Sequence, residues 1–171
     1  MHYKTNLVVA LDIDKNSAIE IIKKISPYIK YFKIGHRLFT EFPEIINYLH
    51  KENKSVFLDL KYHDIPSVIA SAIKVAGEKY HPYAITLHIS GGKGMLQEVV
   101  KTKFNLPEEI QPKIFGVTIL TSLDNEDLKL LGIKSSITQQ VRKMARLAKE
   151  CLLDGVVCSG KEVKYIKETF G

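Results

Sequence analysis

Four ionisable residues stand where two apolar runs of the sequence end. Asp59 and Lys61 follow the apolar run 56–58, Asp64 lies just beyond them, and Lys33 ends a second apolar run. Residues two apart in a β-strand face the same way, so Asp59 and Lys61 project together, and a neighbouring strand could add Lys33. Lysines and aspartates packed this closely shift one another's pKa values, which is typical of a catalytic site at strand ends. The alternative is a pair of surface salt bridges.

The segments that must position these residues alternate between apolar runs and amphipathic patterns. Apolar runs of strand length occupy residues 7–11, 31–34, 56–60, 84–87, 114–119 and 155–158. Helical patterns follow at 14–25, 37–49, a segment that opens at 65–66, a segment after 91–92, 137–153 and 161–170. Near-continuous apolar strands separated by amphipathic helices predict a parallel sheet covered by helices.

Such a sheet is either doubly wound or part of a (β/α) barrel. Charged residues at the predicted carboxyl ends of the first three strands favour the barrel, whose active sites collect there; they are Asp12, Lys33, Asp59 and Lys61. No Gly-x-Gly-x-x-Gly pattern follows the first strand, which weakens the dinucleotide-binding alternative.

The composition indicates one globular domain. The chain has 171 residues, of which 45% are hydrophobic and 26% charged, enough for a sizeable core. No apolar stretch is long enough to span a bilayer and the first residues show no secretory pattern, so we expect a cytoplasmic protein. Cys151 and Cys158, on a predicted helix and the following strand, fit reduced thiols better than a disulfide or a metal site.

The net charge of +6 would suit an anionic substrate or a nucleic acid. The lysines are scattered rather than gathered in a run or interleaved with aromatic residues, so a solvated, lysine-rich surface explains the charge better. We therefore expect neither a nucleic-acid partner nor a membrane partner. No cluster of metal ligands stands out, and His63 and His88, which could be acids or bases, have no visible partner and are interpreted as structural.

The segment FLDLKYHDIP at 57–66 strongly resembles the signature of the orotidine 5′-phosphate decarboxylases, which make uridine monophosphate. Further motifs of the same family follow in the same order along the chain: VVALD at 8–12, FKIG at 32–35, LHISGG at 87–92, VTILTS at 117–122 and LDGVVCS at 153–159. The resemblance implies a (β/α)8 TIM barrel that works as a homodimer, with neither a metal nor an organic cofactor.

The resemblance also implies roles for individual residues. Lys61 would be the proton donor, Asp59 would lie against the substrate carboxylate, and Lys33 would join the ribose to the active site. Asp64 would reach into the site of the partner subunit. The substrate-binding residues would be Asp12 at a ribose hydroxyl, Lys33, Ile65, and Thr121 at the pyrimidine ring.

The chemistry is consistent with these roles. Loss of carbon dioxide leaves a carbanion at an sp2 ring carbon, and a fixed ammonium is both a complementary charge and a proton source. A carboxylate beside the substrate carboxylate would crowd the ground state.

Two departures from the family pattern stand out. Ser67-Val68 replaces the usual Asn-Thr, so a hydroxyl expected near the partner's ribose is absent at Val68. Residues 1–171 also cover about six β-α units, and the family's last two units, which hold the substrate phosphate, have no counterpart. We therefore expect one (β/α) barrel domain, incomplete at its C-terminal side, with doubtful activity on its own.

Two other functions remain open at this point. One is a magnesium-dependent sugar-phosphate decarboxylase or aldolase of the same superfamily, although the ammonium of Lys33 would repel the metal. The other is a non-catalytic barrel remnant that associates through its open sheet edges.

Overall fold

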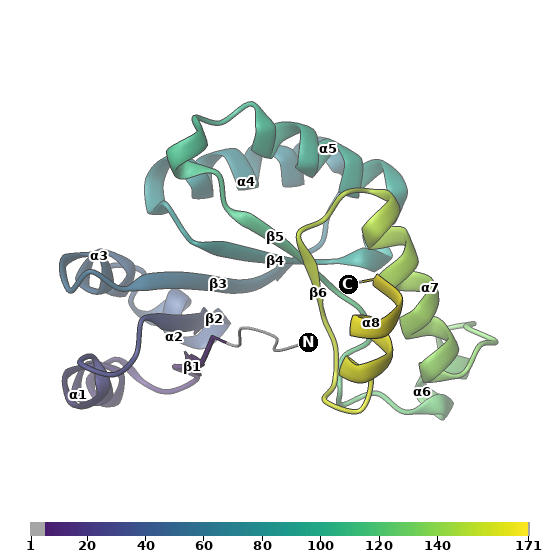
Figure 1. The fold of residues 1–171 in the computed structure, drawn as a ribbon, viewed down its shortest axis with the longest axis horizontal. Coiled ribbons are helices and arrows are strands. Elements are labelled where there is room, and N and C mark those ends of the chain that lie inside the picture. Colours follow the sequence, from purple (N-terminus) through teal and green to yellow (C-terminus); the bar gives the residue numbers. More distant parts are fainter. Residues whose placement is uncertain (1–5, 171) are drawn as a thin grey trace.

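The computed structural model describes residues 6–170, which form one parallel sheet surrounded by helices (Figure 1). Six strands lie in the sheet in the order of the chain. They are β1 (Val8–Ala10), β2 (Tyr31–Gly35), β3 (Ser55–Tyr62), β4 (Ala84–His88), β5 (Lys113–Val117) and β6 (Gly155–Val157). The sheet curls, with the long helices around its outer side (Figure 1). The predicted barrel-type fold is thus confirmed, and each strand ends within two residues of its predicted position.

The helices connect consecutive strands, and the last of them follows β6. They are α1 (Lys15–Ile25), α2 (His36–Glu41), α3 (Ile45–Lys51), α4 (Pro66–Tyr80), α5 (Gly92–Phe104), α6 (Asn125–Leu130), α7 (Ile137–Glu150) and α8 (Val163–Phe170). Local signals explain several ends. Asp14 caps α1 by accepting hydrogen bonds from the backbone N–H groups of Asn16 and Ser17, and Pro66 begins α4, where its missing N–H costs nothing.

The helix predicted at 37–49 is wrong as a single element. The structure has two helices there, α2 and α3, separated by Phe42, Pro43 and Glu44. Proline has no N–H and disfavours helical dihedrals in the residue before it, and Phe42 accordingly has φ −152° and ψ 73°. Helix α6 was not predicted at all, although Asp124 and Asp127 form a capping box at its start.

The core lies mainly between the sheet and the helices around it. Strand residues such as Phe32, Leu58 and Ile85 are fully buried, and helix residues such as Ile22 and Ile73 pack against the same cluster. Alternate positions of β2, β3 and β5, such as Phe57 and Phe115, are only partly buried, while β4 is buried at four successive positions. Polar residues inside these strands are therefore exceptions that need partners. None of the helices among residues 6–170 is both long and apolar enough to cross a membrane.

Candidate active site

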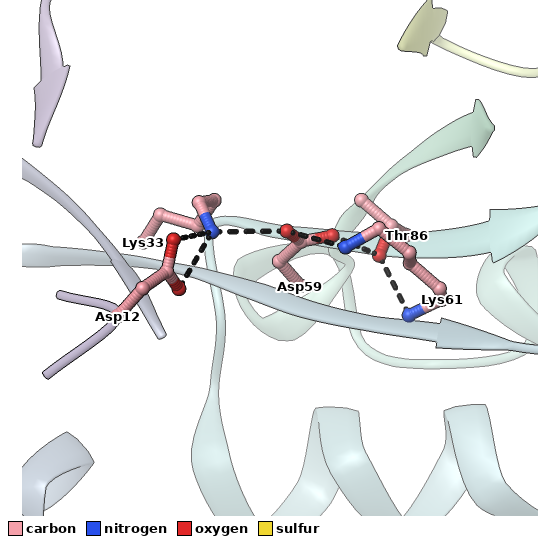
Figure 2. A network of polar contacts seen from close by, with 5 residues as sticks. All are labelled: Asp12, Lys33, Asp59, Lys61 and Thr86. Carbon is pink, nitrogen blue, oxygen red and sulfur yellow. Dashed lines mark hydrogen bonds and ion pairs between the residues drawn. The ribbon is translucent and has the colours of Figure 1, made fainter. Parts of the chain in front are cut away.

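The charged residues predicted from the sequence meet at the carboxyl ends of the first three strands (Figure 2). Lys33 Nζ lies 3.1 Å from both carboxylate oxygens of Asp12 and 3.1 Å from Asp59 Oδ2. Lys61 Nζ lies 2.9 Å from the same Asp59 oxygen. Negative and positive groups thus alternate along a continuous chain, Asp12, Lys33, Asp59 and Lys61. We name these four residues the charge network.

Asp59 is the most buried member of the charge network, with 7% of its surface exposed. Burial alone would raise the pKa of this carboxyl, but the hydrogen bonds from Lys61, Thr86 and Lys33 outweigh it and hold the pKa below its ordinary value. Asp59 is therefore ionised at neutral pH. A buried carboxylate of this kind fixes the positions of the ammonium groups around it.

Lys33 is held between two carboxylates. Burial acts to lower the pKa of its ammonium, but the hydrogen bonds to Asp59 and Asp12 have the larger combined effect, so the pKa lies above its ordinary value. Lys33 therefore carries a permanent positive charge. It occupies the space between the carboxylate oxygens of Asp12 and Asp59, which are the atoms that a cation would otherwise bind.

Lys61 departs from regular strand geometry, although it lies inside β3. Its φ of 44° is in the left-handed region, which costs about 1–2 kcal/mol for a residue with a side chain. The pairing of β3 with β4 shifts register between Leu58 and Tyr62 at the same place. Strand alternation predicted that Asp59 and Lys61 would meet. They do, but the Lys61 side chain is positioned by an irregular backbone and not by regular alternation.

The structure places the other predicted site residues outside the charge network. Asp64 is exposed, and its Oδ1 accepts a hydrogen bond from the backbone N–H of Ile65 at 2.7 Å. Asp12, rather than Asp64, supplies the second carboxylate that faces Lys33. Ile65 is exposed at the start of α4, and Thr121 is exposed in the turn after β5. Within residues 6–170, no ion pair joins Asp64 to the two lysines.

His63 and His88 are each other's neighbours, which the sequence did not reveal. Their rings lie 5.4 Å apart at an angle of 49°. Burial is the main cause that lowers the pKa of His88, and the electrostatic interactions with the His63 ring and Lys61 act in the same direction. His88 is therefore neutral at physiological pH.

Two residues of the site were missed in the sequence. Thr86 of β4 donates a hydrogen bond from Oγ1 to Asp59 Oδ1 at 2.8 Å. Gly35 leaves space for the carboxylate of Asp12, since a Cβ at this position would lie 2.7 Å from Asp12 Oδ1. Thr86 had a signal, because a polar residue in an apolar strand that is buried on both faces needs a partner.

Among the residues that the structure describes, the charge network is the clearest cluster of ionisable side chains. No group of three or more His, Cys, Asp and Glu residues among those described has the geometry of a metal site. Cys151 and Cys158 are free thiols, the first buried and the second partly buried.

A curled parallel sheet with charged residues at the carboxyl ends of its strands defines the class of (β/α)-barrel enzymes. Within this class, residues 5–171 match the family model of the Orotidine 5'-phosphate decarboxylase / HUMPS family. The chain belongs to this family, as its motifs predicted.

Relatives of known name support the assignment. The chain is 38% identical over 167 residues to an orotidine 5'-phosphate decarboxylase from Shewanella sediminis, a match that covers 96% of this chain and 70% of the relative. An enzyme of the same name from Saccharophagus degradans is 40% identical, with 96% and 69% covered. The crystal structure of orotidine 5'-phosphate decarboxylase from Lactobacillus acidophilus superimposes with a TM-score of 0.89 at 30% identity, covering 98% of this chain and 77% of that one.

Proposed function

We propose that the charge network decarboxylates orotidine 5′-phosphate to uridine 5′-phosphate without a metal or an organic cofactor. The observation that carries this proposal is the alternation of Asp12, Lys33, Asp59 and Lys61, which fixes the Lys61 ammonium beside the buried carboxylate of Asp59. Family membership supports the reaction type, and the two relatives named above carry the name of this activity.

Lys61 is the proton donor in this proposal. The bond between the pyrimidine ring and the carboxyl group breaks, carbon dioxide leaves, and the electron pair remains on the ring carbon. The ammonium of Lys61 attracts this developing negative charge and then transfers its proton to the same carbon. Asp59 holds the ammonium in place at 2.9 Å and adds negative charge beside the substrate carboxylate.

Four residues complete the proposed substrate site. Asp12 accepts a hydrogen bond from a ribose hydroxyl, and Lys33 connects Asp12 with Asp59, from which it lies 3.1 Å away. Ile65 and Thr121 are proposed to contact the substrate, and both are exposed in the segments that follow β3 and β5.

Gly35 offers a test of the role of Asp12. We expect Gly35→Ala to raise KM about tenfold or more with a smaller effect on kcat, because the new methyl group displaces the Asp12 carboxylate that binds the ribose. The backbone of Gly35, with φ −96°, permits alanine, so the effect is steric. Steady-state kinetics of the full-length gene product give both constants. Gly94→Ala is the control, since the nearest atom to its Cβ is 4.0 Å away; an unchanged KM in Gly35→Ala contradicts the assignment.

We propose that the protein is a homodimer with shared active sites, and an apolar stripe on α4 supports this. Ile65, Val68 and Val75 are between 46% and 61% exposed and lie three and seven residues apart, on one face of the helix. The stripe borders a hollow lined in part by Tyr62, and Asp64 stands next to its first residue. A second copy of this chain that covers the stripe would bring its own Asp64 close to the interface.

We also propose that residues 1–171 belong to a single (β/α) barrel domain, because the sheet is continuous from β1 to β6. A cytoplasmic location is proposed as well. It agrees with the two free thiols, which persist in reducing compartments.

A direct assay tests the proposed reaction. Purified protein is incubated with orotidine 5′-phosphate, and uridine 5′-phosphate is measured by chromatography with and without a strong chelator. We expect turnover that the chelator does not lower. Turnover that requires added magnesium favours the sugar-phosphate alternative, and no turnover by a folded dimer favours the non-catalytic one.

The polypeptide of residues 1–171 on its own provides a further prediction. We expect its decarboxylation rate to be at least about a hundredfold below that of a family member with eight strands, because misplacement by about 1 Å costs that much. Its β1 and β6 are both edge strands of only three residues, so the strand ends that carry the site are less firmly held. Circular dichroism confirms folding, and a rate near that of the eight-strand enzyme contradicts the prediction.

A further inference from the structure

Thr86 is a fully buried polar residue in the otherwise apolar strand β4. Its exposed fraction is 0%, and its hydroxyl makes two hydrogen bonds with β3 (Figure 2). Oγ1 lies 2.8 Å from Asp59 Oδ1 and 2.9 Å from the backbone nitrogen of Lys61. Thr86 therefore contacts the two residues that face the reacting carboxyl group in the proposed reaction, Asp59 and Lys61.

The direction of these bonds follows from the donors available. The Lys61 N–H donates to Thr86 Oγ1, so the single hydroxyl hydrogen of Thr86 is free to donate to Asp59. Asp59 Oδ2 is occupied by Lys33 and Lys61, and Oδ1 by Thr86. Donors on both oxygens fix the plane of the Asp59 carboxylate. Of the three donors Lys33, Lys61 and Thr86, the Thr86 hydroxyl is the uncharged one.

Thr86 also accounts for the irregular backbone at Lys61. The strand pairs Leu58 with Ile85 and Tyr62 with Leu87, so Asp59, Leu60 and Lys61 lie opposite Thr86 alone. A left-handed residue inside a strand leaves the regular ladder, and its N–H then needs another acceptor. The Thr86 hydroxyl is that acceptor. On its other side Thr86 pairs regularly with Phe115 of β5, so the hydroxyl can be removed without disturbing that ladder.

We propose that Thr86 is a positioning residue that fixes the Asp59 carboxylate and the Lys61 backbone relative to each other, so that the ammonium meets the reacting carbon. This inference rests on the proposed decarboxylation. It assigns the second carboxylate oxygen to a neutral side chain, because Lys33 and Lys61 both pair with Asp59 Oδ2 while the Thr86 hydroxyl donates to Oδ1.

Two substitutions separate the hydroxyl from the shape of the side chain. In the full-length gene product, we expect Thr86→Val to lower kcat about 10- to 100-fold with KM changed by less than about threefold. Thr86→Ser keeps the hydroxyl and should retain kcat within about threefold of the original. Thr118→Val is the control, because Thr118 is also buried, at 3% exposure, but donates to the carbonyl of Val157 instead. If Thr86→Val does not fold, Thr86→Ala takes its place.

The pH dependence of kcat distinguishes this role from a general loss of rigidity in the protein. Removing a donor from a carboxylate disfavours its charged form, so the Asp59 pKa should rise and the acid limb of kcat should move to higher pH. The other titratable groups around Asp59 remain in every variant: Asp12, Lys33, Lys61 and His88. A limb that moves in Thr86→Val but not in Thr86→Ser or Thr118→Val supports the proposal.

Nuclear magnetic resonance makes the test independent of turnover. The Asp59 carboxyl pKa and the exchange rate of the Lys61 amide should both rise in Thr86→Val and stay unchanged in Thr86→Ser. If the original protein does not decarboxylate orotidine 5′-phosphate, the proposed function fails, while these two measurements still decide whether Thr86 holds Asp59 and Lys61. An unchanged kcat, carboxyl pKa and amide exchange in Thr86→Val overturn the inference, as does a Thr86→Ser variant impaired to the same degree.

Discussion

Lys61→Ala is expected to abolish decarboxylation while leaving the fold intact. The substitution removes both the proton donor and the positive charge beside the developing carbanion, so the rate should fall by roughly 10⁴-fold or more. Asp59 keeps hydrogen bonds from Lys33 and Thr86, so it does not become an unpaired buried charge. The free energy of unfolding should therefore change by about 1 kcal/mol or less. Uridine 5′-phosphate formation and a thermal unfolding curve measure the two effects.

A second lysine serves as the control for this experiment. Lys129 on α6 also forms an ion pair, with Glu126 at 2.7 Å, but this pair is exposed and lies on a helix surface. Lys129→Ala should leave turnover unchanged. Substantial turnover by Lys61→Ala, after contamination with host enzyme is excluded, removes Lys61 from the role of proton donor.

Mixing two inactive variants is expected to restore activity if the active sites are shared between subunits. Lys61→Ala and Asp64→Ala subunits each lack one required group, but one site of each mixed dimer receives Lys61 from one chain and Asp64 from the other. With random exchange, half of the dimers are mixed and half of their sites are complete, so about one quarter of the original activity should return. The exposure of Asp64 and its position outside the charge network motivate this arrangement.

The structure supplies a matched negative control for the mixing experiment. Asp59 and Lys61 of the same chain lie 2.9 Å apart, so they belong to the same site. Mixing Asp59→Asn with Lys61→Ala subunits should therefore restore nothing. Mass spectrometry verifies exchange of differently tagged subunits. If exchange occurs and Lys61→Ala with Asp64→Ala stays inactive, the shared site is wrong.

Local sequence patterns were sufficient to predict the sheet and the four residues of the charge network. The apolar runs mark strands that are buried on one face and at least partly covered on the other, and charged residues directly after them mark the carboxyl ends of parallel strands. Asp12, Lys33, Asp59 and Lys61 could be found in this way. Pro43 was also a readable signal for the break between α2 and α3, and it was overlooked because the apolar spacing continues across it.

The rest of the site depends on contacts between strands. The left-handed φ of Lys61 and the register shift opposite Thr86 arise where β3 meets β4, and no pattern within β3 indicates them. The space that Gly35 leaves for Asp12 likewise involves residues from separate parts of the chain. Asp64 stands close to Lys61 in sequence but turns out of the charge network, so proximity in sequence overstated its proximity in space.

The sequential order of the strands has a consequence for biosynthesis. Each strand pairs only with its neighbours in the chain, so every pairing within the sheet spans a single β-α unit. Every member of the charge network, together with Thr86, lies in the segment that ends with β4 at His88. Ribosomes add about 5–20 residues per second, and N-terminal segments gain the opportunity to fold first. The nascent chain can therefore assemble its catalytic charges around Asp59 before β5 and β6 have left the ribosome.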